Sequence, residues 1–442
     1  MILIAYSLLA APGLFAQGEN SNSDDDPGPF TALLAGGDTT KIPWEVVAFA
    51  SGLTVHQRLG ATIQIRIPGK PLASRLGAGV LLFAAQIADA QGHLYERRDR
   101  FDLVRQKPPP NADFLSVSFD AFLLPGDYKV GIAVYDSSTE EYSVEHRDLH
   151  VAAIKNDPLP EFWNGLPSVE FWPAHAPLES LADSVKLPLK TQRRLRVEIL
   201  LNTTITELVF PSKKLSDDSL ASLIPEFEAL SQVAPTNGPL DVAALDLTQQ
   251  RVSFEQDDVK SLDWQRLRDS LTAGNPLVVS AASLENRKRE AQYFASQVLQ
   301  RISARGADAD PAGTKPLRVV IVLSGPMSFR SGESLRPIAA SGDCQCRVYY
   351  IRSHTLEAVE RGAIGDDESA NGPAARQNSP TVFDPDATGR PTQQPDACAG
   401  SLCDEDELAG TLAPLHPRVY DVYSPMDFRK ALASVLNDIG ER

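Results

Sequence analysis

The sequence predicts a multi-domain protein in which an antiparallel β-sandwich precedes an α/β domain with a doubly wound parallel sheet. A chain of 442 residues is too long for one ordinary hydrophobic core, so we expect at least two domains. From Trp44 to Ala152, alternating or apolar runs are separated by turn residues, as in antiparallel sandwiches. From Arg193 onward, apolar strands alternate with amphipathic helices, which indicates a parallel sheet covered by helices.

The sandwich is assigned to residues 42–155. Its predicted strands are Trp44–Ala50, Ala61–Ile67, Val80–Asp89, His93–Leu103, Phe114–Leu123, Asp127–Tyr135 and Tyr142–Ala152. The Leu-Pro-Gly-Asp-Tyr motif that ends at Tyr128 precedes an alternating strand. This motif resembles the tyrosine corner of immunoglobulin-like and fibronectin-type sandwiches. The resemblance implies an immunoglobulin-like sandwich in which the Tyr128 hydroxyl binds a backbone group.

The second domain is assigned to residues 191–442, after a Pro- and Trp-rich linker over residues 156–190. Its predicted strands are Arg196–Leu201, Asp241–Leu247, Arg251–Glu255, Pro276–Ala281, Arg318–Leu323, Arg347–Arg352 and Arg418–Tyr423. Helices are predicted over Leu215–Leu230, Val259–Leu271, Leu284–Ala304 and the closing residues after Ser424. The linker aromatics Phe162, Trp163, Phe171 and Trp172 either pack against a domain or form a carbohydrate platform.

The N-terminus resembles a secretory signal peptide. Residues 1–17 are apolar and then turn abruptly polar, which predicts cleavage near Ala16. The alternative is a buried N-terminal helix. Residues 18–41, rich in Gly, Ser, Asn and Asp, are predicted to be disordered. No second stretch is long enough to cross a bilayer, so we expect an exported protein, periplasmic or extracellular, with no integral membrane segment in the mature chain.

The four cysteines lie close to one long segment of the second domain. Residues 362–413 are poor in large apolar side chains and are predicted to be a disordered insertion. The cysteines are Cys344, Cys346, Cys398 and Cys403. In an exported protein an even number of cysteines indicates disulfides, and a bridge between the two pairs would connect the ends of this segment. The alternative is a four-thiolate zinc site, although Cys-x-Cys is an unusual spacing for zinc.

Charge and motif content exclude several functional classes. The net charge of −16 opposes nucleic acids and anionic membranes as partners. The sequence contains no Gly-x-Ser-x-Gly elbow, Walker loop or His-Glu-x-x-His motif. We therefore expect a non-enzymatic protein.

Small oxygen-bearing side chains follow the first strand of the α/β domain. Asn202, Thr204 and Thr206 come directly after Leu201, and Ser324 ends a later apolar strand. Ligands of open α/β sheets collect at the carboxyl ends of strands. The order and spacing of residues 193–442 resemble the von Willebrand factor A domain of bacterial VWFA-related proteins.

This resemblance implies a first loop of pattern Asp-x-Ser-x-Ser, matched here by Asn202, Thr204 and Thr206. It also implies a third loop that begins with Asp, matched by Ser324, and a second loop whose Thr corresponds to Ser280 or Ser283. Both acidic positions are therefore replaced by neutral residues. Magnesium depends on one or two carboxylates, so we expect no bound metal and no other cofactor. Two roles remain for the loop side chains: they cap the following helix, or they bind a partner directly.

Together these features predict an exported, non-enzymatic interaction module of adhesion or assembly type that binds a protein partner through a metal-free A-like domain. One alternative is a metal-dependent adhesion domain that tolerates Asn202. Another is an envelope hydrolase or carbohydrate-binding protein.

Overall fold

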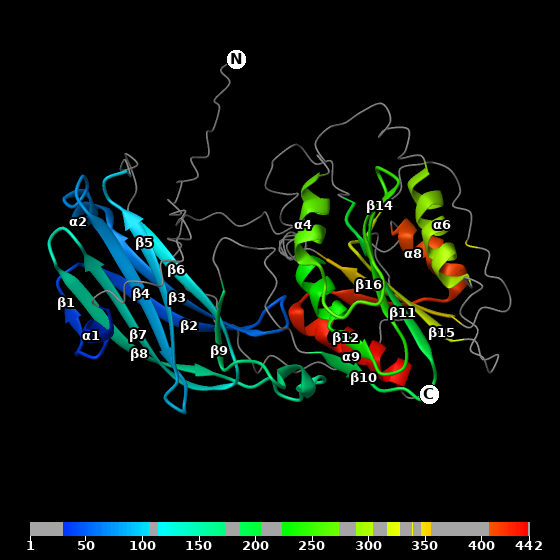
Figure 1. Ribbon diagram of the computed structural model, residues 1–442, viewed down its shortest axis with the longest axis horizontal. Coiled ribbons are helices and arrows are strands. Elements are labelled where there is room, and N and C mark those ends of the chain that lie inside the picture. The colour runs from blue at the N-terminus through cyan, green and yellow to red at the C-terminus, as the bar shows by residue number, and fades with distance from the viewer. Residues whose placement is uncertain are drawn as a thin grey trace, which may run out of the picture. The chain divides into compact units, whose positions relative to one another are not determined.

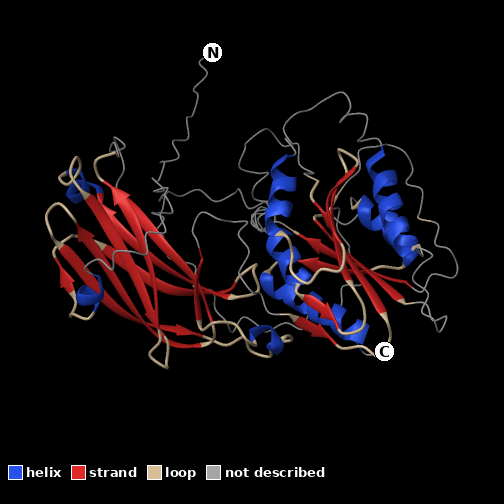
Figure 2. Ribbon diagram, in the orientation of Figure 1, coloured by secondary structure: helices blue, strands red, loops and turns tan. Residues whose placement is uncertain are grey.

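The structure is a computed structural model that describes residues 30–105, 114–172, 186–204, 223–273, 289–303, 316–327, 338, 346–354 and 406–440. The chain divides into two compact units, Met1–Val185 and Lys186–Arg442. Figure 1 labels the elements of both units. The first is built mainly from strands, and the second combines strands with helices (Figure 2). Among the described residues, no helix is long and apolar enough to cross a membrane.

The first unit contains two antiparallel sheets. Its strands are β1 (Thr39–Thr40), β2 (Glu45–Leu53), β3 (Leu59–Pro68), β4 (Val80–Ala88), β5 (Leu94–Asp102), β6 (Phe114–Leu123), β7 (Gly126–Asp136), β8 (Tyr142–Val151) and β9 (Val169–Trp172). Short helical turns are α1 (Phe30–Leu34), α2 (Gly69–Ala73) and η1 (Pro160–Trp163). One sheet has the order β1-β8-β7-β4-β5, and the other has the order β2-β3-β6-β9.

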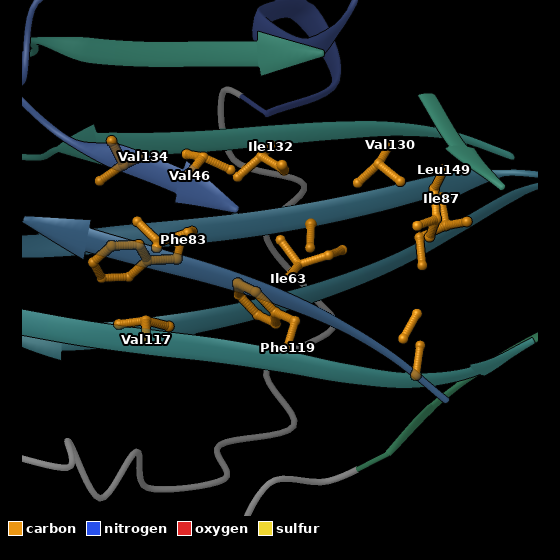
Figure 3. Close-up of a cluster of buried hydrophobic side chains, with 14 of the residues drawn as sticks. Val46, Ile63, Phe83, Ile87, Val117, Phe119, Val130, Ile132, Val134 and Leu149 are labelled. Atoms are coloured by element: carbon orange, nitrogen blue, oxygen red, sulfur yellow. The ribbon is translucent and has the colours of Figure 1, made fainter. Parts of the chain in front are cut away.

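The two sheets share one hydrophobic core, as a β-sandwich requires. Figure 3 shows side chains of this core, including Ile63, Val117 and Phe119 from one sheet and Phe83 and Ile132 from the other. All five are no more than 5% exposed. The alternating strand pattern in the sequence therefore corresponds to inward-facing apolar residues, in agreement with the antiparallel sandwich prediction.

The tyrosine corner has the predicted hydrogen bond. The Tyr128 hydroxyl donates to the Leu124 carbonyl oxygen at 2.8 Å. It also lies 3.1 Å from the carbonyl oxygen of Ser168, just before β9. Burial raises the pKa of Tyr128 to about 12. The hydroxyl thus stays protonated and joins the β6–β7 turn to the chain segment that enters β9.

Two boundary predictions for the first unit are wrong. Residues 30–41 are not disordered, because they form α1 and β1. Phe30 and Leu34 give this segment apolar side chains to bury. The predicted linker over residues 156–190 includes β9, which pairs with β6 and extends the first unit. Residues 1–29, with the signal-peptide prediction, lie outside the described residues.

The second unit contains the remaining elements. Its strands are β10 (Leu187–Leu189), β11 (Leu195–Asn202), β12 (Val233–Pro235), β13 (Leu240–Asp246), β14 (Arg251–Gln256), β15 (Leu317–Ser324), β16 (Cys346–Ser353) and β17 (Arg418–Val422). Its labelled helices are α4 (Trp264–Ala273), α6 (Glu290–Ile302), α8 (Glu407–Leu412), η3 (Ala413–Leu415) and α9 (Pro425–Gly440). Residues 223–231 are also helical. Because α8 begins at Glu407, the predicted insertion over 362–413 extends too far at its C-terminal end.

The larger sheet of this unit has the order β14-β13-β11-β15-β16-β17. Strand β14 is antiparallel to β13, and the other neighbouring strands are parallel. Numbered by their order in the chain, these strands read 3-2-1-4-5-6, the order of doubly wound α/β sheets. The direction of winding reverses between β11 and β15, whose carboxyl ends therefore flank a topological switch point.

Described helices pack on both faces of this sheet. Val320, Val322 and Tyr350 belong to the apolar cluster that also contains residues of α6 and α8. On the opposite face, the Tyr349 hydroxyl donates to the Asp438 carboxylate on α9. Coverage of both faces explains why every residue of β15 is buried. It also explains why Val319–Leu323 are all apolar instead of alternating with polar residues.

Candidate functional site

The sequence-predicted oxygens lie at the topological switch point of the large sheet. In the parallel pairing of β11 with β15, Leu201 lies opposite Leu323. The next residues are therefore Asn202, which ends β11, and Ser324, which ends β15. They are separated by 122 positions in the sequence. Parallel pairing brings them together because the carboxyl ends of parallel strands share one edge of the sheet.

Asn202 and Ser324 are in direct contact. The Asn202 amide Nδ2 donates to the Ser324 Oγ atom at 2.9 Å, and both residues are no more than 2% exposed. The same Nδ2 atom lies 3.5 Å from the Met327 sulfur. Ser324 Oγ donates in turn to the Gly325 carbonyl oxygen at 2.7 Å. Asn202 and Ser324 are thus hydrogen-bonded to each other across the ends of β11 and β15.

The loop after β11 is fixed to the end of β13. Asn202 Oδ1 accepts a hydrogen bond from the Thr204 backbone N–H at 3.1 Å. Thr204 Oγ1 accepts from the Leu247 backbone N–H at 2.8 Å, and Thr203 Oγ1 donates to the Leu245 carbonyl oxygen. Thr204 therefore connects the loop after β11 to the loop after β13. Thr206, Ser280 and Ser283 lie outside the described residues.

This donor set does not fit a divalent cation. The amide nitrogen of Asn202 points its hydrogen toward Ser324, and the amide oxygen is already used by Thr204. Magnesium requires oxygen ligands, commonly with one or two carboxylates. A carboxylate about 4 Å from a unit charge contributes roughly 4 kcal/mol at an effective dielectric of 20, and neutral ligands lack this term. In the described part of the chain, no group of three His, Cys, Asp or Glu residues could hold a metal.

An ion-pair network that the sequence analysis missed adjoins this contact. Arg352 Nη1 donates to Asp406 at 3.0 Å, and Arg352 Nε donates to Asp421 Oδ1 at 2.6 Å. His354 Nε2 lies 2.9 Å from the same Asp421 oxygen. Asp406 also accepts from the Met327 backbone N–H at 3.2 Å. The network thus joins the ends of β15, β16 and β17 to the residue before α8.

Electrostatics stabilise the charged forms of this network. Burial opposes ionisation of Asp421, but the hydrogen bonds from His354 and Arg352 lower its pKa to about 2. The hydrogen bond to Asp421 raises the pKa of Arg352. A signal in the sequence was Arg352, the charged residue at the carboxyl end of the predicted strand Arg347–Arg352. Its partners could not be identified there, because they lie 54 and 69 positions away.

An aromatic side chain is exposed beside the network. Tyr423 is 47% exposed, and its ring stacks on His354 with centroids 4.2 Å apart.

The predicted disulfides are only partly covered by the described residues. His354 and Asp406 flank residues 355–405, which include Cys398 and Cys403 and are not described. Cys344 also lies outside the described residues, whereas Cys346 begins β16. The disulfide assignment therefore stays a prediction.

A buried carboxyl group, that of Glu226, contacts the carboxyl end of β16. Ser353 Oγ donates to Glu226 Oε1 at 3.1 Å, and Glu226 is only 4% exposed. Burial raises its pKa to about 8, although the Ser353 hydrogen bond opposes this increase. The other carboxyl oxygen has no hydrogen-bond partner among the described residues. The sequence analysis did not single out Glu226, because a glutamate within a helix ordinarily faces solvent.

The linker aromatics are engaged in packing in the first unit. Phe162 is 2% exposed, and the Trp163 Nε1 atom donates to Asp157 at 2.6 Å. The Trp172 ring lies 4.5 Å from the His56 ring and 5.4 Å from the Phe122 ring, between centroids. These contacts favour the packing interpretation over a carbohydrate platform.

Comparisons with known proteins give only distant similarities. No protein-family model matches the chain, and no curated protein matches it. A solved structural-genomics target is 16% identical, with 26% of this chain and 90% of that chain covered and a TM-score of 0.18. AggA, the major subunit of aggregative adherence fimbriae from Escherichia coli, is 12% identical, with coverages of 26% and 100% and a TM-score of 0.17. A glycosyl hydrolase family 2 member from Bacteroides cellulosilyticus is 11% identical, with coverages of 72% and 40% and a TM-score of 0.18.

Proposed function

We propose that this chain is an exported, non-enzymatic interaction module whose second unit is a metal-free von Willebrand factor A-like domain. In this proposal a protein partner binds at the carboxyl edge of the large sheet. The observation that carries it is the hydrogen bond between Asn202 and Ser324 at the switch point. An amide and a hydroxyl occupy the positions where the metal-binding pattern has acids, and they satisfy each other.

Two further features support a binding role at this edge. The strand order gives the sheet a switch point between β11 and β15, where ligands of open α/β sheets bind. Tyr423 adds an exposed aromatic ring, a residue type enriched in protein interfaces. Export is proposed from the apolar N-terminus alone.

The metal-free character is tested by titrating magnesium, calcium and manganese against the melting temperature of the full chain. We expect no change for the wild type at millimolar metal. The double variant Asn202→Asp/Ser324→Asp introduces two carboxylates. It is expected to be stabilised by about 2.7 kcal/mol when the metal concentration is 100 times the dissociation constant. A rise of several degrees in the wild type would refute the proposal in favour of a metal-dependent adhesion domain.

The location of the partner surface is tested by cross-linking in the native envelope fraction. Tyr423→Ser alters an exposed residue at the carboxyl edge, and Arg194→Ser alters an exposed residue just before β11, at the opposite edge. We expect the cross-linked product to be lost with Tyr423→Ser and retained with Arg194→Ser. Equal loss in both variants, or recovery of the wild-type protein alone, would count against a carboxyl-edge interface.

A further inference from the structure

The outer face of the five-stranded sheet carries small apolar residues that are buried although they point away from the sandwich core. Ala84 on β4, Ala133 on β7 and Val144 on β8 are no more than 1% exposed. They cluster with Phe30 and Leu34, separately from the main core. Polar residues are expected on the solvent side of such a sheet. We call Ala84, Gly131, Ala133 and Val144 the shelf.

The shelf is buried because the chain before β2 covers it. Phe30 and Leu34, which are 2% and 7% exposed, are spaced four residues apart on α1 and therefore lie on one side of the helical turn. Gly131 leaves the space that Leu34 fills, since a Cβ atom at this position would lie 3.2 Å from Leu34 Cδ2. We call residues 30–40 the strap.

A histidine on β8 fastens the strap. His146 Nδ1 lies 2.7 Å from Asp38 Oδ1, and His146 Nε2 lies 3.1 Å from the Leu34 carbonyl oxygen. Both partners are hydrogen-bond acceptors, and only the imidazolium form of histidine donates from both ring nitrogens. The side-chain hydrogen bond from His146 lowers the pKa of Asp38. His146 therefore contacts two positions of the strap, a carboxylate and a backbone carbonyl group.

Further contacts attach the strap and the residues that follow it. Strand β1 pairs with β8 through two residues, and the His146 backbone N–H donates to Asp38 Oδ1 at 3.0 Å. Ser143 Oγ accepts from the backbone N–H groups of Lys41 and Ile42 at 3.0 and 2.8 Å. Arg98 on β5 lies over the Phe30 ring.

We propose that the shelf is a docking site for an apolar helical turn and that the strap is its releasable occupant. The recognised segment has two apolar residues four positions apart and an acid four positions after the second, as in Phe30, Leu34 and Asp38. The apolar contacts of the strap form a small cluster separate from the main sandwich core. Contacts outside the main core open at a lower free-energy cost than the core itself, so strap release leaves the sandwich core intact.

The experiment adds a fluorescent peptide with the sequence of residues 28–43 to full-length variants. In Phe30→Ser/Leu34→Ser the strap loses both apolar anchors and the shelf is left intact. We expect the peptide to bind this variant at least tenfold more tightly than the wild type. Adding Gly131→Val, a β-branched residue suited to a strand, fills the shelf and is expected to abolish the gain. Circular dichroism and thermal melting verify that each variant is folded.

The histidine contact provides the second readout. Adding His146→Ala to Phe30→Ser/Leu34→Ser removes both ring contacts with the peptide and is expected to weaken binding at least threefold. The proposal is overturned if the peptide does not bind the folded double variant, if Gly131→Val leaves binding unchanged, or if His146→Ala leaves binding unchanged.

Discussion

Replacing Glu226 by glutamine should stabilise the second unit in a pH-dependent way. Glu226 is 4% exposed, and burial raises its pKa from the ordinary value of 4.5 to about 8. Between these two values the folded state holds a proton that the unfolded state releases. The contribution of this group to stability is therefore complete below pH 4.5 and is lost as pH rises toward 8.

The size of the effect follows from linkage. Each pH unit between the two pKa values costs the wild type about 1.4 kcal/mol, and glutamine has no proton to lose. From pH 5 to pH 8 the free energy of unfolding of Glu226→Gln should thus gain about 3.5 kcal/mol relative to the wild type, less than three full pH units because titration is incomplete near each pKa. Above pH 8 the difference should level off.

The assay is urea unfolding of both proteins at intervals from pH 5 to pH 9. The transition of the second unit is identified by hydrogen exchange of β15. Comparing two proteins at each pH removes contributions from other titrating groups. The control is Ser353→Ala, which removes the hydrogen bond that opposes the pKa increase of Glu226. It should move the upper limit of the pH window to higher pH. A stability difference between Glu226→Gln and the wild type that is constant from pH 5 to pH 8 would refute the reasoning.

Three further predictions concern other contacts. Tyr128→Phe removes a hydroxyl that binds the Leu124 carbonyl and should lower the stability of the first unit by about 1 kcal/mol in urea unfolding; no loss would mean that the hydroxyl bond is not stabilising. Arg352→Met leaves Asp406 buried without its cation and should cost about 3 to 5 kcal/mol in the second unit, measured in the same way; a loss below about 1 kcal/mol would contradict a buried pair. Asn202→Leu removes the donor to Ser324 and should destabilise the second unit by about 1 to 3 kcal/mol with no dependence on magnesium; calorimetry with added magnesium checks both statements.

Local patterns predicted most of the strands in both units. Strand β6 was predicted with the same bounds, Phe114–Leu123, and β15 within one residue at each end. Alternation and continuous apolar runs depend only on neighbours along the chain, so a single sequence contains them. The segment of residues 30–41 was misjudged because its polar composition concealed Phe30 and Leu34, which become buried only against the shelf.

The candidate site was partly predictable for a similar reason. Asn202 and Ser324 both follow apolar strands, and adjacent parallel strands place such residues at one edge. Predicting their hydrogen bond required only the knowledge that β11 and β15 are neighbours in the sheet. By contrast, Arg352, Asp406 and Asp421 required knowledge of how α8 and β17 meet β16.

The sequence by itself determined the strand pattern, the tyrosine corner at Tyr128 and the absence of acids at Asn202 and Ser324, because these depend on residue type and local spacing. Only the tertiary structure decided that Glu226 is buried, that Arg352 joins two aspartates and that His146 lies between two acceptors. Burial and long-range pairing depend on which elements pack together. The free energy of a charged or polar group depends on those neighbours more than on its position in the chain.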